Sequence, residues 1–156
     1  MRRWIVLLGA AAFGCGGGEI EVVEMACADV VADLATRRAA MTTTASGLMI
    51  EELTAGRGKA AEAGQHVHTH YVLCSSDGNE IDSSLAPGRG VPIDFDLGTG
   101  AMIAGYDEGV QGMKVGGRRI LVLPPEIAYG SSTLPGQAPG SDLVFHVQLM
   151  SIDAPE

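Results

Sequence analysis

MIAGYDEGVQGMKVGGRRILVLPPEIAYG, residues 102–130, is the stretch that decides the fold. Within it, Tyr106, Val110 and Met113 recur at helical spacing, so that one face of a short helix is apolar. The pair Gly116-Gly117 predicts the end of this helix, because glycine readily takes the left-handed conformation found after helices.

The same stretch predicts a sheet beside the helix. Gly105 eases the entry into the helix, and the hydrophobic run 120–123 after it predicts a strand. The prolines at 124–125 stop this strand, since proline cannot donate to a ladder. A helix of about two turns is unstable alone in water, so it must lie against the sheet.

The lining of the gap between helix and sheet predicts a binding pocket. Met102, Ile103, Tyr106 and Tyr129 make it apolar and aromatic, with no cysteine, histidine or glycine-flanked serine as a nucleophile. Such a pocket suits a reaction that needs neither proton transfer nor a covalent intermediate. Rotation about an X-Pro amide is one, with a barrier of about 18–20 kcal/mol.

Several ordered blocks make the chain similar to a known family. The sequence resembles an FKBP-type peptidyl-prolyl cis/trans isomerase over roughly residues 44–153. The blocks that carry the resemblance are HY at 70–71, DGNEIDSS at 77–84, YDEGVQGMKVGGRR at 106–119, LPPEIAYG at 123–130 and DLVFHVQL at 142–149.

This resemblance implies an α+β fold, in which a twisted antiparallel sheet of five or six strands wraps around one short helix. It also implies isomerisation of X-Pro bonds in folding polypeptides, without a metal, nucleotide or other cofactor. The implied partners are proline-containing polypeptides, and macrolide immunosuppressants are implied as ligands. The isomerase domain is expected at 45–153.

The resemblance also implies roles for individual residues. The Ile103 N–H donates to the carbonyl before the bound proline, the Tyr129 hydroxyl donates to a nearby carbonyl, and Asp82 hydrogen-bonds within the pocket. These three form the expected catalytic set. The expected substrate-binding residues are Tyr71, Ile81, Ile93, Phe95, Met102, Ile103, Tyr106, Leu134 and Phe145.

The expected pocket is less aromatic than is usual in the family. Ile81 and Ile93 stand where Phe is common, Tyr106 where Trp is common, and Leu134 on the flap. Each lost aromatic contact is worth about 0.5–1.5 kcal/mol, so the expected loss of activity is roughly tenfold to a few hundredfold. The alternative function is therefore a chaperone or proline-peptide-binding module of the same fold with weak catalysis.

The amino terminus predicts a lipoprotein of the bacterial cell envelope. Residues 1–14 form the expected signal peptide, with two arginines before an apolar run too short to span a bilayer as a helix. Cys15 is then the lipidated first residue, and Gly16 after it favours the outer membrane, facing the periplasm, over inner-membrane retention. Ordinary signal cleavage, with Cys15 a bystander, is the alternative.

Residues 15–44 are expected to hold the lipidated cysteine, a glycine tether and a short helical spacer. A helical stripe runs through Val23, Cys27, Val30 and Leu34. In an oxidising compartment, Cys27 could pair with Cys74, or both could stay free thiols, because the sequence does not give the distance between them.

The net charge and the spacing of the histidines limit the partners that the sequence predicts. The net charge of −9 and the absence of a basic stripe argue against nucleic acid. His66, His68 and His70 share one strand face, which a metal could use. The sequence shows no obvious fourth ligand, so a solvated face is predicted, with no metal site. The Gly-rich segment 56–64 is predicted to be a loop.

Overall fold

The computed structural model describes residues 20–153 of the chain. The predicted signal peptide 1–14, the lipidated Cys15 and the glycine tether 16–18 lie outside the described residues. Among the described helices, none combines the length and the apolar character that crossing a membrane requires.

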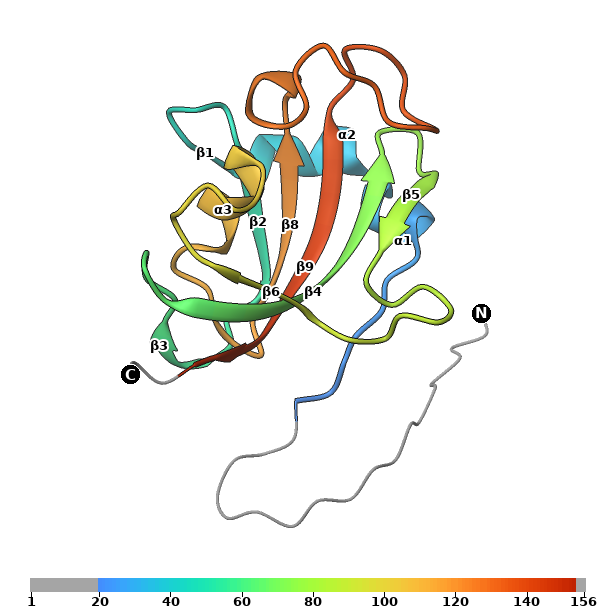
Figure 1. Cartoon of the computed structure of the whole chain (residues 1–156). Coiled ribbons are helices and arrows are strands. Elements are labelled where there is room, and N and C mark those ends of the chain that lie inside the picture. Colours follow the sequence, from blue (N-terminus) through green and yellow to red (C-terminus); the bar gives the residue numbers. More distant parts are fainter. Residues whose placement is uncertain (1–19, 154–156) are drawn as a thin grey trace.

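A strongly twisted antiparallel sheet forms the centre of the molecule (Figure 1). Its strands follow the order β1-β2-β8-β9-β4-β5, and β6 pairs with the first half of β4. The bounds are β1 Thr42–Thr43, β2 Met49–Thr54, β4 His66–Ser75, β5 Glu80–Ser83, β6 Ile93–Asp96, β8 Arg118–Leu123 and β9 Leu143–Ile152.

The predicted fold class is confirmed, with seven strands in the main sheet where five or six were expected. Part of the segment predicted as a loop at 56–64 is a strand, β3 (Arg57–Ala60), which pairs with β7 (Lys114–Val115) in a second, two-stranded sheet. A polar segment can form a strand here because its partner supplies the pairing.

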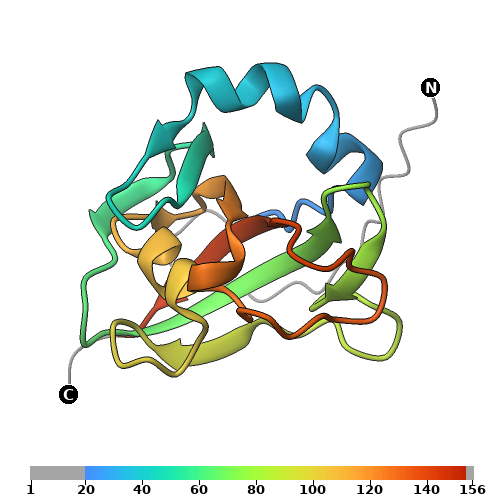
Figure 2. The same ribbon diagram turned by 90° about the horizontal axis from the view of Figure 1, so that it is seen from above.

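The main sheet is buried on both faces. One face carries the larger core, built from α3 (Ala104–Val110) and apolar side chains of β4, β8 and β9. The other face carries a smaller core under α1 (Cys27–Val31) and α2 (Leu34–Arg37). Seen from above, α1 and α2 run along one side of the sheet, and α3 lies on the other (Figure 2).

The central helix is shorter than predicted. It ends at Val110, and Gly112 with φ of 78° supplies the left-handed residue expected at Gly116. Gly105 serves close packing rather than helix entry. A Cβ there would lie 2.6 Å from Leu123 Cγ, so only glycine lets α3 approach β8 this closely.

The amino-terminal helical stripe is interrupted rather than continuous. Asp33 adopts a positive φ of 52° between α1 and α2, which breaks the helix. The Arg37 guanidinium spans the break, since Nη1 donates to the carbonyls of Val30 and Ala32 at 3.0 Å each. The η1 turn (Arg38–Ala40) then leads into β1.

A disulfide joins Cys27 of α1 to Cys74 of β4, across a Cα–Cα distance of 5.5 Å. Of the two alternatives for these cysteines, the structure therefore shows pairing. Both side chains are buried in the smaller core, so the bond attaches the amino-terminal segment to the sheet.

The prediction of a solvated histidine face is wrong for one of its three residues. His70 is 4% exposed, and its Nδ1 lies 3.0 Å from Ser84 Oγ. Along this face of β4, the next residues are Val72 and Cys74 of the smaller core, so solvent reaches only the first part of the strand. His66 and His68 are half-buried there.

Candidate active site

An apolar pocket of about 210 Å³ opens between the start of α3 and the sheet. Strands β4, β5 and β9 form its walls, together with the segment before α3 and the turn after β8. The residues that line it are Tyr71, Leu73, Asp82, Ala101, Met102, Ile103, Tyr106, Tyr129 and Phe145. None of these described lining residues is a cysteine, serine or histidine, so the pocket offers no usual nucleophile of that kind.

Tyr106 forms the floor of the pocket and is fully buried. Its ring packs edge-on against Phe145, with the centroids 5.2 Å apart, and lies 5.9 Å from the ring of Phe95. The hydroxyls of Tyr106 and Thr69 share a hydrogen bond of 2.8 Å, which satisfies both polar groups inside the core. Burial raises the pKa of Tyr106 well above its usual value.

The polar wall of the pocket is a chain of three side chains. The Tyr71 hydroxyl donates to Asp82 Oδ2, and Arg89 Nη1 donates to Asp82 Oδ1 at 2.8 Å. Burial, followed by the hydrogen bond to Asp82, raises the pKa of Tyr71 to about 12. Tyr71 is therefore a neutral hydroxyl at physiological pH, and the Asp82 carboxylate is held in place from both sides.

The rim of the pocket offers hydrogen-bond donors to a ligand. The Ile103 carbonyl accepts the N–H groups of Tyr106 and Asp107 at 3.0 Å, as expected at a helix start. The Ile103 N–H makes no hydrogen bond with any residue in 20–153. Tyr129, which is 39% exposed, stands at the same opening.

The buried carboxylate of Asp107 holds the rim in position. Its Oδ1 accepts the Gly98 N–H at 2.7 Å, and its Oδ2 accepts the Gly100 N–H at 3.4 Å. These bonds tie the turn after β6 to α3. The segment between this turn and α3 carries Met102 and Ile103. Asp107 therefore fixes the direction of the Ile103 N–H.

The structure gathers most, but not all, of the predicted site residues around one pocket. Seven of them line it: Tyr71, Asp82, Met102, Ile103, Tyr106, Tyr129 and Phe145. Four others pack on the same core without lining the pocket: Ile81, Ile93, Phe95 and Leu134. Phe95 contributes indirectly, because its ring packs against that of Tyr106.

Two residues that hold the site together, Arg89 and Thr69, were not predicted from the sequence. Arg89 is the only Lys or Arg between Lys59 and Lys114, and that isolation beside an acidic block was the available signal. Thr69, in β4, has no such signal. Nothing local in the sequence indicates its bond to Tyr106, because 37 residues separate the two.

The comparisons with known proteins agree on one family. The model of the FKBP-type peptidyl-prolyl cis-trans isomerase family matches residues 58–150. A protein of Streptomyces anulatus named FK506-binding protein is 46% identical over 108 residues, which cover 67% of this chain and 86% of that protein. FK506-binding protein 4 of Mycosarcoma maydis is 43% identical over 120 residues, or 77% of this chain, but this match spans only 31% of the fungal protein.

Two solved structures share the architecture. FkpA from Escherichia coli superposes with a TM-score of 0.65 at 34% identity, covering 81% of this chain and 61% of that one. AtFKBP13 superposes with a TM-score of 0.63 at 32% identity, covering 72% of this chain and 98% of that one. With the family match, the identities and the pocket in agreement, the chain belongs to the FKBP-type peptidyl-prolyl cis-trans isomerase family.

Proposed function

We propose that the protein accelerates cis/trans isomerisation of X-Pro bonds in cell-envelope proteins while they fold. The observation that carries the proposal is that the Ile103 N–H, unpaired among residues 20–153, and the buried ring of Tyr106 line the same pocket. A proline ring fits on an apolar aromatic floor, and the carbonyl before it can accept the N–H. The lining as a whole offers shape and hydrogen bonds rather than nucleophiles.

The chemistry follows from the electronics of the amide. Twisting the C–N bond removes its resonance and with it much of the charge separation between oxygen and nitrogen. A dry, apolar pocket therefore stabilises the twisted state relative to the planar one. This is differential binding of the transition state, and it requires no proton transfer at a side chain.

Three residues have proposed roles in that binding. Ile103 donates its N–H to the carbonyl before the proline, and Tyr129 donates its hydroxyl to a second carbonyl of the peptide. Asp82, held by Tyr71 and Arg89, is the charged side chain among the described lining residues. Its place in the pocket supports a role in orienting the peptide.

Exchange spectroscopy tests the activity. A proline peptide with resolved cis and trans NMR signals is mixed with the full chain, and the exchange rate is measured. We expect clear acceleration, reduced at least about tenfold when Tyr129→Phe is combined with Asp82→Val. Asp77→Asn, in the turn before β5, is the matched control and should retain the full rate. No acceleration by the wild-type chain would refute the proposal.

We propose further that the protein is a lipoprotein, anchored through Cys15 to the outer membrane and facing the periplasm. The basic and apolar residues of 1–14 support a signal peptide. The disulfide between Cys27 and Cys74 supports an oxidising compartment. Mass spectrometry of the mature amino terminus tests this proposal: an unacylated end, or one starting elsewhere than Cys15, would contradict it.

FK506-type macrolides are proposed as ligands of the same pocket. Two relatives carry FK506 binding in their names. The aromatic floor and the free N–H of Ile103 are groups that a macrolide carbonyl and ring can meet. FK506 should inhibit the exchange reaction in a titration, and an unchanged rate at saturating FK506 would exclude shared binding.

A weakly catalytic chaperone or peptide-binding module is the second candidate. Ile81 and Ile93 favour it, because they pack on the core as aliphatic residues and add no ring to the pocket. This candidate predicts that suppression of client aggregation survives when Tyr129→Phe with Asp82→Val abolishes exchange. Loss of both properties together would favour the isomerase.

A further inference from the structure

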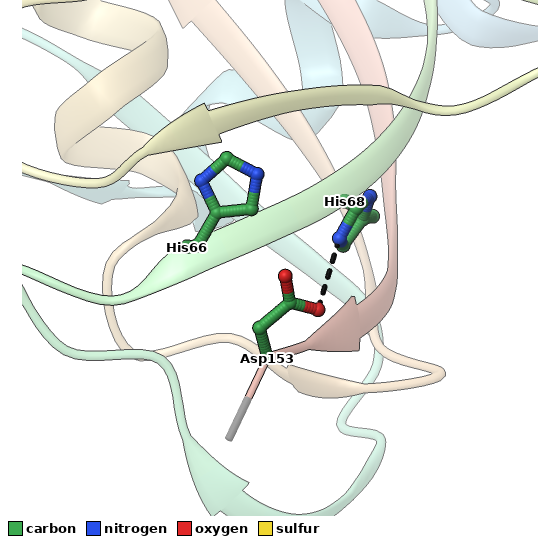
Figure 3. Close-up of side chains that lie close together, drawn as sticks. All are labelled: His66, His68 and Asp153. Carbon is green, nitrogen blue, oxygen red and sulfur yellow. Dashed lines mark hydrogen bonds and ion pairs between the residues drawn. The ribbon is translucent and has the colours of Figure 1, made fainter. Parts of the chain in front are cut away.

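The outer end of β4 carries a cluster of side chains that the isomerase pocket does not use. His66 and His68 stand on one face of the strand, and Asp153 follows the end of β9 beside them (Figure 3). One ligand atom from each of the three lies within 4.8 Å of the other two. None of the three lines the pocket.

The strand pairing explains why these residues meet. A register shift in β9 places Leu149 opposite Thr69 but Ser151 opposite His68, so one residue is passed over. The shift turns Ile152 toward the larger core and leaves Asp153 on the histidine face. The Asp153 N–H then donates to the His66 carbonyl at 2.9 Å, which fixes its backbone next to the histidines.

The neighbouring strand adds two more carboxylates to the same face. In β6, Asp96 is paired opposite His66 and Asp94 opposite His68. His66 Nδ1 lies 2.7 Å from Asp96 Oδ1, and His66 Nε2 lies 3.3 Å from Asp94 Oδ2. On the third side, His68 Nε2 lies 3.0 Å from Asp153 Oδ1. Two imidazoles are thus enclosed by three carboxylates.

From this cluster we infer a second, surface site that binds a divalent zinc ion through His66, His68 and Asp153. Three atoms within 4.8 Å of one another lie at most roughly 2.8 Å from a common centre, and zinc–nitrogen bonds are about 2.1 Å. Each side chain has to move by less than about 1 Å. All three are partly exposed, so an ion can enter from solvent.

The two other carboxylates, Asp94 and Asp96, can orient His66 for zinc binding. A zinc-bound histidine commonly donates its other ring N–H to a carboxylate, which orients the ring. His66 has Asp96 beside Nδ1 and Asp94 beside Nε2, so one carboxylate keeps its ring N–H when the other nitrogen turns to the ion. With neutral imidazoles, the three carboxylates carry three negative charges, and a dication relieves their mutual repulsion.

Zinc at this position would join three strands. It would connect the start of β4 to the end of β9. Strand β6 would be held through the contacts of Asp94 and Asp96 with His66. Because the ion binds the folded chain at a site that the unfolded chain lacks, it should raise the melting temperature. At a hundredfold excess over Kd, we expect a rise of about 5–11 °C.

Calorimetric titration of the untagged full chain with zinc chloride tests the inference. One zinc per chain should bind, and His68→Asn or Asp153→Asn should each weaken binding at least about tenfold. Asp77→Asn, a matched carboxylate at the other end of β4, should bind zinc like the wild-type chain. The exchange rate of a proline peptide should be the same with and without zinc, so failure of the zinc site and failure of the isomerase are distinguishable.

Three outcomes would overturn the zinc site. The first is no binding, or a Kd weaker than about 1 mM. The second is unchanged binding in both His68→Asn and Asp153→Asn, with their fold verified by circular dichroism. The third is binding that disappears only in Cys15→Ala, which would place the ion on that thiol. Asp153 is exposed, so its substitution by Asn should not impair folding.

Discussion

Thr69 and Tyr106 share a hydrogen bond of 2.8 Å inside the larger core, where neither side chain has exposed surface. The bond joins β4 to α3 across the floor of the pocket. A tyrosine can stand at this position because Thr69 satisfies its hydroxyl. The two residues therefore form one unit, and a change in either leaves the other with an unpaired polar group.

Tyr106→Phe should lower the free energy of unfolding by about 1–2 kcal/mol, because the Thr69 hydroxyl stays buried without a partner. Thr69→Val should have a similar cost for the same reason. The double variant should cost less than the sum of the two single ones, since no orphaned hydroxyl remains. Urea unfolding of all four proteins measures the coupling, and strictly additive effects would contradict it.

Gly109→Ala should destabilise the protein through overlap with Leu121 of β8. A Cβ at Gly109 would overlap the Leu121 side chain, and overpacking costs about 1–3 kcal/mol. The better helix propensity of alanine offsets up to about 1 kcal/mol of this cost, which leaves a net loss of up to about 2 kcal/mol. Leu121→Val in the same chain should recover part of the loss. A double-mutant cycle by urea unfolding checks this, and zero coupling between the two sites would refute the overlap.

Local pattern was enough to predict several elements of the fold. In the last strand, Leu143–Ile152, apolar residues alternate without a break, so the sequence alone indicates a strand there. The strand predicted at 120–123 begins two residues earlier, at Arg118. The gathering of Tyr71, Asp82 and Tyr129 around Ile103 followed from the family resemblance rather than from spacing.

Long-range pairing was beyond the reach of the sequence. The β9 register shift that turns Asp153 toward His68 depends on two strands about 80 residues apart in the chain. The burial of His70 depends on which parts of the sheet the amino-terminal segment covers. Residue spacing within one strand carries no information about either, so the histidine face could not be assigned from sequence.

Reduction of the Cys27–Cys74 disulfide should lower the free energy of unfolding. The bond closes a loop of 47 residues, and the loss of chain entropy in the unfolded state corresponds to about 4 kcal/mol. Urea unfolding with and without dithiothreitol measures the difference. The double variant Cys27→Ala, Cys74→Ala is the control and should show no response to dithiothreitol. An equal response in both proteins would place the effect elsewhere.

His146 should make the free energy of unfolding depend on pH in the acidic range. It lies in the middle of β9, opposite Val72 and Ile120, and its Nε2 has no hydrogen-bond partner among the described residues. Burial, together with the charge of Arg118, lowers the pKa of His146 to about 4. The unfolded chain binds this proton below about pH 6.5, whereas the folded chain does not bind it until about pH 4.

The stability that neutral His146 contributes is therefore fully present above pH 6.5 and is lost as the pH falls toward 4. At 1.36 kcal/mol per pKa unit, the loss reaches about 3 kcal/mol at pH 4. His146→Leu removes the titrating group and should flatten this part of the pH profile. Some slope should remain, because burial also lowers the pKa of His70. Urea unfolding at pH 7, 6 and 5 compares the two proteins, and identical slopes would show that His146 is not the group responsible.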